Sequence, residues 1–360
     1  MSTPLPFWSS VGLVADREIR AKLRSKAFLI SAAILLLAVL GSIVIGSLVA
    51  QNPSDIPVAA VAETEEVATA LDGVDVTVAG SVEEARELVR AEEVDAAVLP
   101  ASGDLGYSVV ALDSTPDTLM GLLSQRPELE LLDPSSQNEL LVYFVALGFG
   151  LIFFMSAVSF GATIAQSVVE EKQTRVVELL LSAIPARALL AGKVVGNSVL
   201  ALGQIVLIAV AATAALALTG QQNLLTSLGP SVLWFIAFFA VGFVLLAAIF
   251  AASAALVSRQ EDVGAVTSPV MTLITIPYFL IVFFPDNDLV LTIMSYVPFS
   301  APIGMPMRIF LGTAEWWEPL ASLAIVLLAT AAAIAFGARV YENSLLRMGG
   351  RVKLAEALKG

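Results

Sequence analysis

The sequence of 360 residues contains no cysteine and no histidine. Without cysteine there is no disulfide framework, no thiolate metal site and no cysteine nucleophile. Without histidine the commonest general base and metal ligand is missing as well. Charged residues make up only 14% of the chain. An enzyme is therefore not expected, and we expect neither a cofactor nor a metal ion bound by this chain.

A phosphate-binding loop is also absent from the sequence. Such a loop requires the pattern G-x-x-x-x-G-K-[ST]. The nearest candidate, Gly192-Lys193, lacks the earlier glycine and is followed by valine. We therefore expect no ATP site in this chain. Separately, we expect no nucleic-acid partner.

Apolar residues are abundant, at 58% of the chain. A helix needs about 20 consecutive apolar residues to cross a bilayer. Six stretches are long enough, namely 27–50, 140–166, 194–218, 231–257, 264–284 and 319–340. The sequence thus predicts a polytopic α-helical membrane protein with six transmembrane helices.

The distribution of Lys and Arg predicts the orientation, because basic residues are retained on the cytoplasmic side. With both termini in the cytoplasm, fifteen of the nineteen basic residues lie inside. Outside remain only Arg86, Arg90, Arg126 and Arg308. We expect a multi-pass protein of the cell (plasma) membrane, which in a bacterium is the inner membrane, with residues 341–360 as a cytoplasmic tail.

The first 26 residues combine an apolar pattern with a run of cations. Phe7, Val11 and Val14 recur at helical spacing, and the later Lys and Arg side chains are placed to reach lipid head groups. Residues 1–26 are therefore interpreted as an interfacial elbow helix. Ordinary flanking charge before the first span is the alternative.

Residues 51–139 are rich in Asp and Glu and alternate between strand and helix patterns. Strands are expected at 57–61, 74–79, 95–100 and 107–113, and helices at 65–71, 81–93 and 114–125. Ser81 followed by Glu84 has the pattern of a capping box. This alternation predicts an extracytoplasmic α/β domain inserted between the first two transmembrane helices. Its adjacent acidic pairs do not share a helix face, which favours a solvated surface.

Residues 167–193 form a charged, amphipathic stretch between the second and third spans. One predicted helical stripe contains Glu171, Arg175, Glu178 and Ser182. Another contains Val177, Leu180, Leu181 and Ile184. Pro185 is expected to end this helix. The pattern alone leaves open a partner-binding surface or a connector at the lipid interface.

Small and polar residues within the spans indicate helix contacts. The second span contains Gly150 and Gly161, and the third begins with Gly192-x-x-x-Gly196, a pattern that lets helices approach closely. The polar side chains that either pack between helices or line a pathway are Asn197, Gln204, Thr272 and Thr275.

Three stretches resemble the type-2 ABC exporter permease family. EEKQTRVVELLLSAIPARALLAGK (170–193) is similar to its signature loop, and VPFSAPIGMPMRIFLG (297–312) and YENSLLRMGGRVKLAEALKG (341–360) are similar to later segments. The likeness is greatest to the NatB-like branch, sodium-efflux permeases with a large extracytoplasmic domain between the first two spans.

The resemblance implies one permease subunit of an exporter whose ATPase, with ATP and Mg, is a separate chain. The residues implied to couple to the cytoplasmic ABC ATPase subunits are Glu170, Glu171, Arg175, Glu178 and Arg187. A second permease, the same or different, completes the transporter within membrane lipids. Residues 285–318 are implied to form an outer re-entrant hairpin, marked by Pro298, Pro302 and Arg308, although an interfacial anchor also fits.

The cargo follows from the chemistry of the spans. Ion sites inside membranes normally contain Asp, Glu or Arg facing the bundle interior, and the interiors of these spans contain essentially none. A hydrophobic or amphiphilic substrate fits this composition better than a bare ion. Sodium efflux is the alternative that the resemblance implies. A membrane-anchored sensor with an extracytoplasmic ligand-binding domain is a third interpretation.

Overall fold

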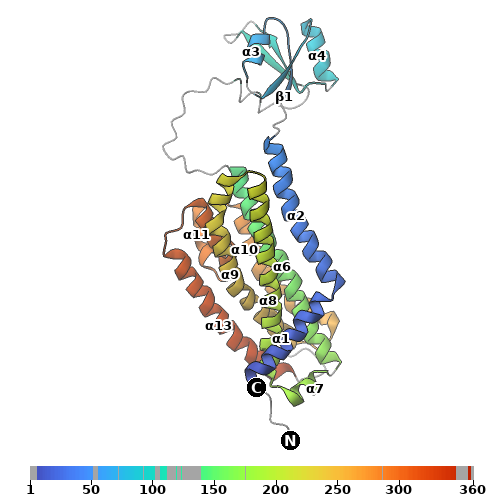
Figure 1. The fold of residues 1–360 in the computed structure, drawn as a ribbon, viewed down its shortest axis with the longest axis vertical. Coiled ribbons are helices and arrows are strands. Elements are labelled where there is room, and N and C mark those ends of the chain that lie inside the picture. The colour runs from blue at the N-terminus through green and yellow to red at the C-terminus, as the bar shows by residue number, and fades with distance from the viewer. Residues whose placement is uncertain are drawn as a thin grey trace. The chain divides into compact units, whose positions relative to one another are not determined.

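The computed structural model describes residues 6–51, 56–71, 73–91, 93–101, 106–111, 119, 123, 139–174, 176–285, 287–345 and 356–357. The chain divides into two compact units, Ile45–Pro134 and the combination of Met1–Val44 with Ser135–Gly360. The smaller unit contains the sheet and the larger one is helical (Figure 1).

The smaller unit is built on a four-stranded sheet in the order β2-β1-β3-β4. Its elements are β1 (Ile56–Ala60), α3 (Glu65–Thr69), β2 (Val74–Val78), α4 (Val82–Arg90), β3 (Ala96–Pro100) and β4 (Tyr107–Ala111). Strand β1 is parallel to both β2 and β3, with Val58 opposite Val76 and Ala96. Strand β4 runs antiparallel to β3. The predicted alternation of strands and helices is thus present in this unit.

Both faces of this sheet are covered, which explains why the central strands are continuously apolar. On one face, Ala85 and Val89 of α4 pack with Ala59 and Ala97. On the other face, Leu119 packs with Val58. Of the helix predicted over 114–125, only Leu119 and Leu123 belong to the described residues, and both are helical.

The capping box predicted at Ser81 is confirmed. The Ser81 side chain accepts a hydrogen bond from the backbone N–H of Glu84 at 3.2 Å. The Glu84 carboxylate reaches back to the backbone N–H of Gly80 at 2.7 Å, one residue earlier than in the standard box. Two backbone donors at the start of α4 are satisfied in this way.

Among the described residues, the larger unit has six helices that are long and apolar enough to cross a membrane, in agreement with the predicted number. They are α2 (Lys26–Gln51), α6 (Glu139–Gln173), α8 (Ala186–Leu218), α9 (Gln222–Ala255), α10 (Val263–Phe283) and α13 (Glu318–Leu345). Its shorter elements are α1 (Phe7–Leu23), α7 (Val176–Ala183), η1 (Gln260–Asp262), α11 (Asp288–Tyr296) and α12 (Ala301–Leu311).

Four of these helices, α6, α8, α9 and α13, extend by several residues beyond the predicted spans. Helix α6 continues to Gln173 through the charged residues that follow 166, and α8 already begins at Ala186. Helix α9 begins at Gln222 rather than near 231, with Pro230 inside it. A proline is tolerated there because membrane helices find other partners for the freed carbonyl. Of the expected tail, 341–345 belongs to α13 and Ala357 packs beside Val340, whereas 346–355 and 358–360 lie outside the described residues.

Helices α6 and α9 form the centre of the unit through matched aromatic rings. The ring centroids of Phe149 and Phe235 are 4.9 Å apart, and those of Phe153 and Phe239 are 5.9 Å apart. Close approach depends on glycine, because a Cβ at Gly161 would overlap the ring of Phe250 in α9. The close-packing role predicted for the small residues of the second span is confirmed at this position.

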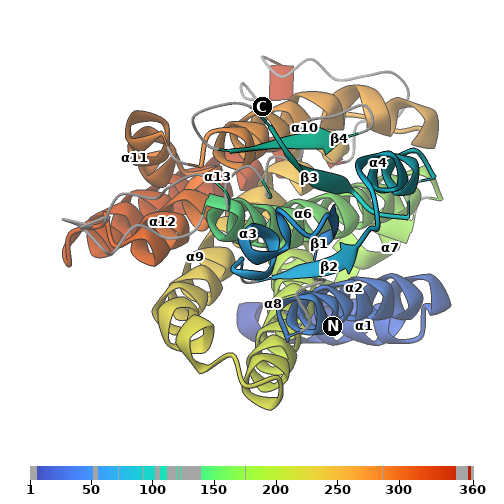
Figure 2. The same ribbon diagram turned by 90° about the horizontal axis from the view of Figure 1, so that it is seen from above.

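Helix α1 packs against the first turns of α8 (Figure 1 and Figure 2). A Cβ at Gly192 would overlap the side chain of Val14, and one at Gly196 would lie 2.9 Å from the carbonyl oxygen of Ala15. The Gly192-x-x-x-Gly196 pattern therefore receives α1 rather than another of the six long helices. Val11 and Val14 are buried in this contact.

The stretch 285–318 contains α11 and α12, which lie against each other (Figure 2). Helix α12 is almost entirely buried, and a Cβ at Gly242 of α9 would lie 2.6 Å from Pro302. Gly304 has the backbone of Met294 and Ser295 within 3.0 Å of its Cβ position. The two short helices therefore form a tight hairpin against α9.

We predict that Gly192→Val displaces α1 from α8, because the added side chain overlaps Val14. Overpacking of this kind costs about 1–3 kcal/mol. The matched control is Gly203→Val on the same helix, where a Cβ meets no atom within 4 Å. Thermal unfolding of the purified chain should show a lower midpoint for Gly192→Val only. Equal midpoints for the two variants would contradict the contact.

Candidate functional site

The stretch predicted to be a partner-binding surface contains a helix break that the sequence pattern did not show. Helix α6 ends at Gln173 and α7 begins at Val176, so Glu171 and Glu178 lie on different helices. The predicted continuous stripe through Glu171, Glu178 and Ser182 is therefore wrong, and Arg175 lies outside the described residues. Pro185 precedes α8 as its N-cap residue, as expected for a chain reversal.

Helix α7 has one buried and one exposed side. Val177 is buried, and Leu180, Leu181 and Ile184 are partly buried against the core of the helical unit. The apolar stripe predicted from the spacing is thus confirmed. On the opposite side Glu178 is exposed, and Leu179 is 74% exposed. Glu170, near the end of α6, is exposed as well.

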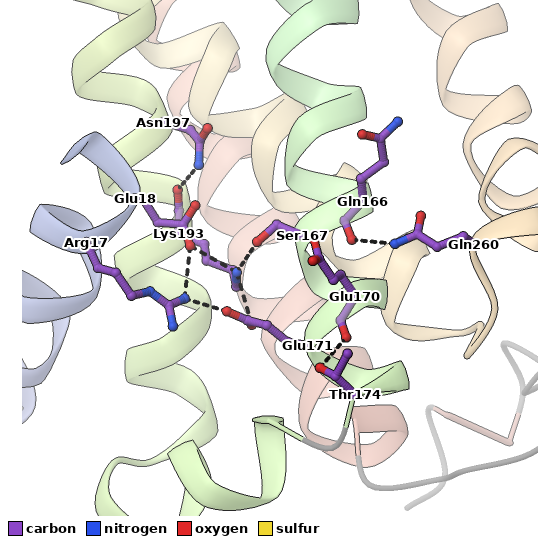
Figure 3. Close-up of polar contacts among 10 residues, drawn as sticks. All are labelled: Arg17, Glu18, Gln166, Ser167, Glu170, Glu171, Thr174, Lys193, Asn197 and Gln260. Carbon is purple, nitrogen blue, oxygen red and sulfur yellow. Dashed lines mark hydrogen bonds and ion pairs between the residues drawn. The ribbon is translucent and has the colours of Figure 1, made fainter. Parts of the chain in front are cut away.

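A cluster of four charged side chains joins α1, α6 and α8 (Figure 3). Its centre is the ammonium of Lys193, which is completely buried. Lys193 Nζ lies 3.0 Å from Glu18 Oε1 of α1 and 3.0 Å from Glu171 Oε2 of α6. Arg17 pairs with both of these carboxylates. We call Arg17, Glu18, Glu171 and Lys193 the buried charge cluster, after its buried members Lys193 and Glu18; the side chain of Arg17 is 42% exposed.

The buried charge cluster is balanced in charge and supported by neighbouring polar groups. Two cations face two carboxylates, so no charge in it is left without an opposite one. Lys193 Nζ also donates to Ser167 Oγ at 2.5 Å. The Asn197 amide donates to the carbonyl oxygen of Lys193 at 2.8 Å, within α8. Removing one partner of such a buried pair is strongly destabilising, because the other charge stays in a medium of low dielectric.

The electrostatics of α1 follow from this arrangement. Burial by itself raises the pKa of Glu18, but the charge and hydrogen bond of Lys193, with those of Arg17, outweigh burial and lower that pKa below its usual range. Glu18 is thus held in its ionised form. One turn further along α1, Lys22 Nζ lies 4.0 Å from the centroid of the Phe160 ring in α6. Burial lowers the pKa of Lys22 to about 8.

Lys172 connects two other helices at the same end of the unit. Its buried ammonium donates to the carbonyl oxygens of Ala255 and Ser344, at 2.8 Å each. These carbonyls lie at the C-terminal ends of α9 and α13, where a cation is favoured by the helix dipoles. Lys172 therefore draws the ends of α6, α9 and α13 together.

Two exposed contacts complete this end of the molecule. Arg187 at the start of α8 forms a bidentate pair with Glu342 of α13, at 2.7 and 3.0 Å. Gln260 of η1 donates to the carbonyl oxygen of Gln166 in α6 at 3.1 Å. The turn at 258–262 is thereby tied to α6.

The polar residues predicted to pack between helices or to line a pathway differ in their burial and their hydrogen bonds. Asn197 is buried beside the buried charge cluster, whereas Gln204 is partly exposed further along α8. Thr272 is exposed and bonds within α10 to the carbonyl oxygen of Ser268, and Thr275 is partly exposed. The hydrogen bond that the Asn197 amide donates stays within its own helix, to the carbonyl oxygen of Lys193.

Arg308, predicted to mark the outer hairpin, is buried on α12 of the α11–α12 pair. Its guanidinium forms a bidentate pair with Glu318 of α13, at 2.9 and 2.7 Å. The Tyr296 hydroxyl donates to the same carboxylate at 2.8 Å. Pro298 is partly buried, while Trp316 and Trp317 are exposed. The guanidinium thus holds the hairpin against α13.

Comparisons with known proteins agree with this architecture. A family model described as "ABC-2 family transporter protein" matches residues 26–339. The protein YhaP of Bacillus subtilis, described as uncharacterized, is 25% identical over 212 residues, covering 55% of this chain and 50% of its own length. The uncharacterized protein MJ1024 of Methanocaldococcus jannaschii is 23% identical over 215 residues, covering 59% and 52%. The chain thus spans about half the length of these curated relatives. No solved structure matches it.

We predict that Lys193→Met destabilises the chain by about 3–5 kcal/mol, because two carboxylates would then share the single cation of Arg17. Thermal unfolding of the purified chain measures this effect. The control is Arg187→Gln, which breaks an exposed pair and should leave the unfolding midpoint unchanged. Similar midpoints for Lys193→Met and the native chain would show that the cluster does not hold the helices.

The Lys22 environment predicts a pH dependence of stability. Its pKa is about 8 in the folded chain and 10.5 as an ordinary side chain, so between these values the unfolded chain binds more protons. Stability should therefore rise with pH across this window. Lys22→Met removes the titrating group, and its unfolding midpoint should lack that part of the rise. Parallel pH profiles for Lys22→Met and the native chain would refute the assignment.

Proposed function

This chain belongs to the ABC-2 transporter family and is a membrane permease, and we propose that it exports a substrate with energy from ATP hydrolysed by separate subunits. The partners would be cytoplasmic ABC ATPase subunits, which bind ATP and Mg. The absence of a phosphate-binding loop from this sequence supports a separate ATPase.

Both termini, α7 and the buried charge cluster would lie on the cytoplasmic side. The distribution of Lys and Arg supports this orientation. The Arg308 guanidinium is one of four basic groups assigned outside, and it is neutralised by Glu318. The smaller α/β unit would then be extracytoplasmic, as in the NatB-like branch.

The exposed side of α7 would dock on the ATPase. The observation that carries this proposal is that α7 is a separate short helix with an apolar side buried and Glu178 and Leu179 exposed. Exposed Glu170 and Arg187 would border this surface. Glu171 would act differently from the other predicted coupling residues, because its carboxylate is used inside the buried charge cluster. Arg175 keeps its predicted role at the docking surface.

The cargo would be hydrophobic or amphiphilic and would leave from the cytoplasm or the inner leaflet. This choice is supported by the buried lysines of the described spans, which are already paired within the protein. Lys172 and Lys193 lie near helix ends and hold helices together, so neither is free to bind cargo. Export of sodium, the alternative, would have to rely on carbonyl and hydroxyl ligands such as those of Thr272 and Thr275.

A second permease subunit would complete the transporter. Only 6% of the residues in the apolar stretch of α2 are buried within this chain, against 50% for α9. Side chains such as Leu37, which is 66% exposed, therefore need to be covered by lipid or by another subunit.

The docking proposal predicts that Glu178→Lys combined with Leu179→Asp uncouples the permease from its ATPase. Both side chains are exposed, so the permease should retain its unfolding midpoint. Stimulation of ATP hydrolysis by the permease, measured in proteoliposomes with the co-purified ATPase, should fall at least about fivefold.

The matched control is Glu83→Lys, the same charge change at an exposed position of α4 in the smaller unit. It should leave the stimulation unchanged. Native stimulation in the α7 double variant would exclude α7 as the docking surface.

A further inference from the structure

Helix α2 is attached to the rest of the helical unit mainly at its first residues. Only 6% of the residues in its apolar stretch are buried, the lowest share among the six candidate spans. The ring of Phe28 lies 5.6 Å from that of Phe160 in α6. Lys22 of α1 lies above both of these rings. The placement of α2 therefore depends on the placement of α1.

Helix α1 is fixed to the unit at three successive levels. Val14 fills the notch at Gly192, Glu18 pairs with Lys193, and Lys22 contacts Phe160. The first contact is apolar packing, and the third is a cation–π contact between the Lys22 ammonium and the Phe160 ring. The middle one is a buried ion pair, and breaking it would leave a charge unpaired in a medium of low dielectric, so we take it as the contact that sets the position of α1 along α8.

The same ion pair is continuous with the end of α6. Glu171 lies two residues before Gln173, where α6 ends and the connection to α7 begins. Its carboxylate pairs with Lys193 through one oxygen and with Arg17 through the other. A displacement of the α6–α7 connection must therefore move α1 as well, or leave buried charges unpaired at a large cost.

We propose that Glu18 and Lys193 are positioning residues that make α1, and through it α2, move as one body with the end of α6. The proposal rests on the proposed function only for the source of the movement, which is docking of the ATPase on α7. The buried charge cluster thus carries displacement from the docking surface to the span that is least packed within this chain.

The test measures distances between spin labels in the full chain in lipid nanodiscs, without ATPase. Because the native chain has no cysteine, introduced cysteines are the sole labelling sites. Leu328→Cys on α13 serves as the reference position and is combined with Leu13→Cys on α1, Leu37→Cys on α2 or Leu207→Cys on α8, all exposed. Labelled chain is diluted with excess unlabelled chain, so that only distances within one copy are measured.

In Lys193→Met, the distance distributions from α1 and from α2 should broaden together, while that from α8 stays as in the native chain. Glu18→Gln keeps the shape of the side chain and removes its charge, so it provides the same test if Lys193→Met does not fold. Arg20→Gln breaks the exposed pair with Asp16 on α1 and should change none of the distributions.

Two results would overturn the proposal. One is broadening for α1 while α2 keeps its native distribution, and the other is native distributions for both helices in the two cluster variants. Since no ATPase is present, these results are independent of the α7 experiment. If the α7 experiment excluded docking at α7, the source of the movement would be wrong, but the distance measurements would still test whether α1 and α2 are held by Glu18 and Lys193.

Discussion

The buried ammonium of Lys193, held between the carboxylates of Glu18 and Glu171, determines how three helices meet at one end of this protein. In a medium of low dielectric each of these charges needs the others. Helix α1 is consequently held on α8, and the end of α6 is held on both. The other buried cations among the described residues, Lys22, Lys172 and Arg308, likewise join helices. In the described helical unit, these buried charges join neighbouring helices.

Much of the fold was predictable because apolar length and periodicity are local properties of the sequence. The six spans, the alternation of strands and helices in 51–139 and the cap at Ser81 follow from such patterns. The ends of helices were less predictable. Helix α6 continues through Glu170 and Glu171, since a charged residue at a helix end can pair with a neighbouring helix that the local pattern does not reveal.

The site was predictable in its location and less so in its chemistry. The sequence indicated the amphipathic stretch around α7 and the glycine notch of α8. It did not identify Glu18, because the partner of Glu18 is distant in sequence at Lys193. The one local signal was the notch itself, since a helix that fits Gly192 and Gly196 places its next turn beside Lys193. Glu318 was also missed as the partner of Arg308, although only ten residues separate them, because the two residues lie on different helices, α12 and α13.

The central claim, that this permease is driven through α7 by a separate ATPase, is tested most directly by crosslinking. A photoreactive amino acid placed at Leu179, which is 74% exposed on α7, would be activated in native membranes and its products identified by mass spectrometry. The account predicts a crosslink to a polypeptide that contains the G-x-x-x-x-G-K-[ST] phosphate-binding loop. Crosslinks that reach only lipid, or only proteins without such a loop, would contradict it.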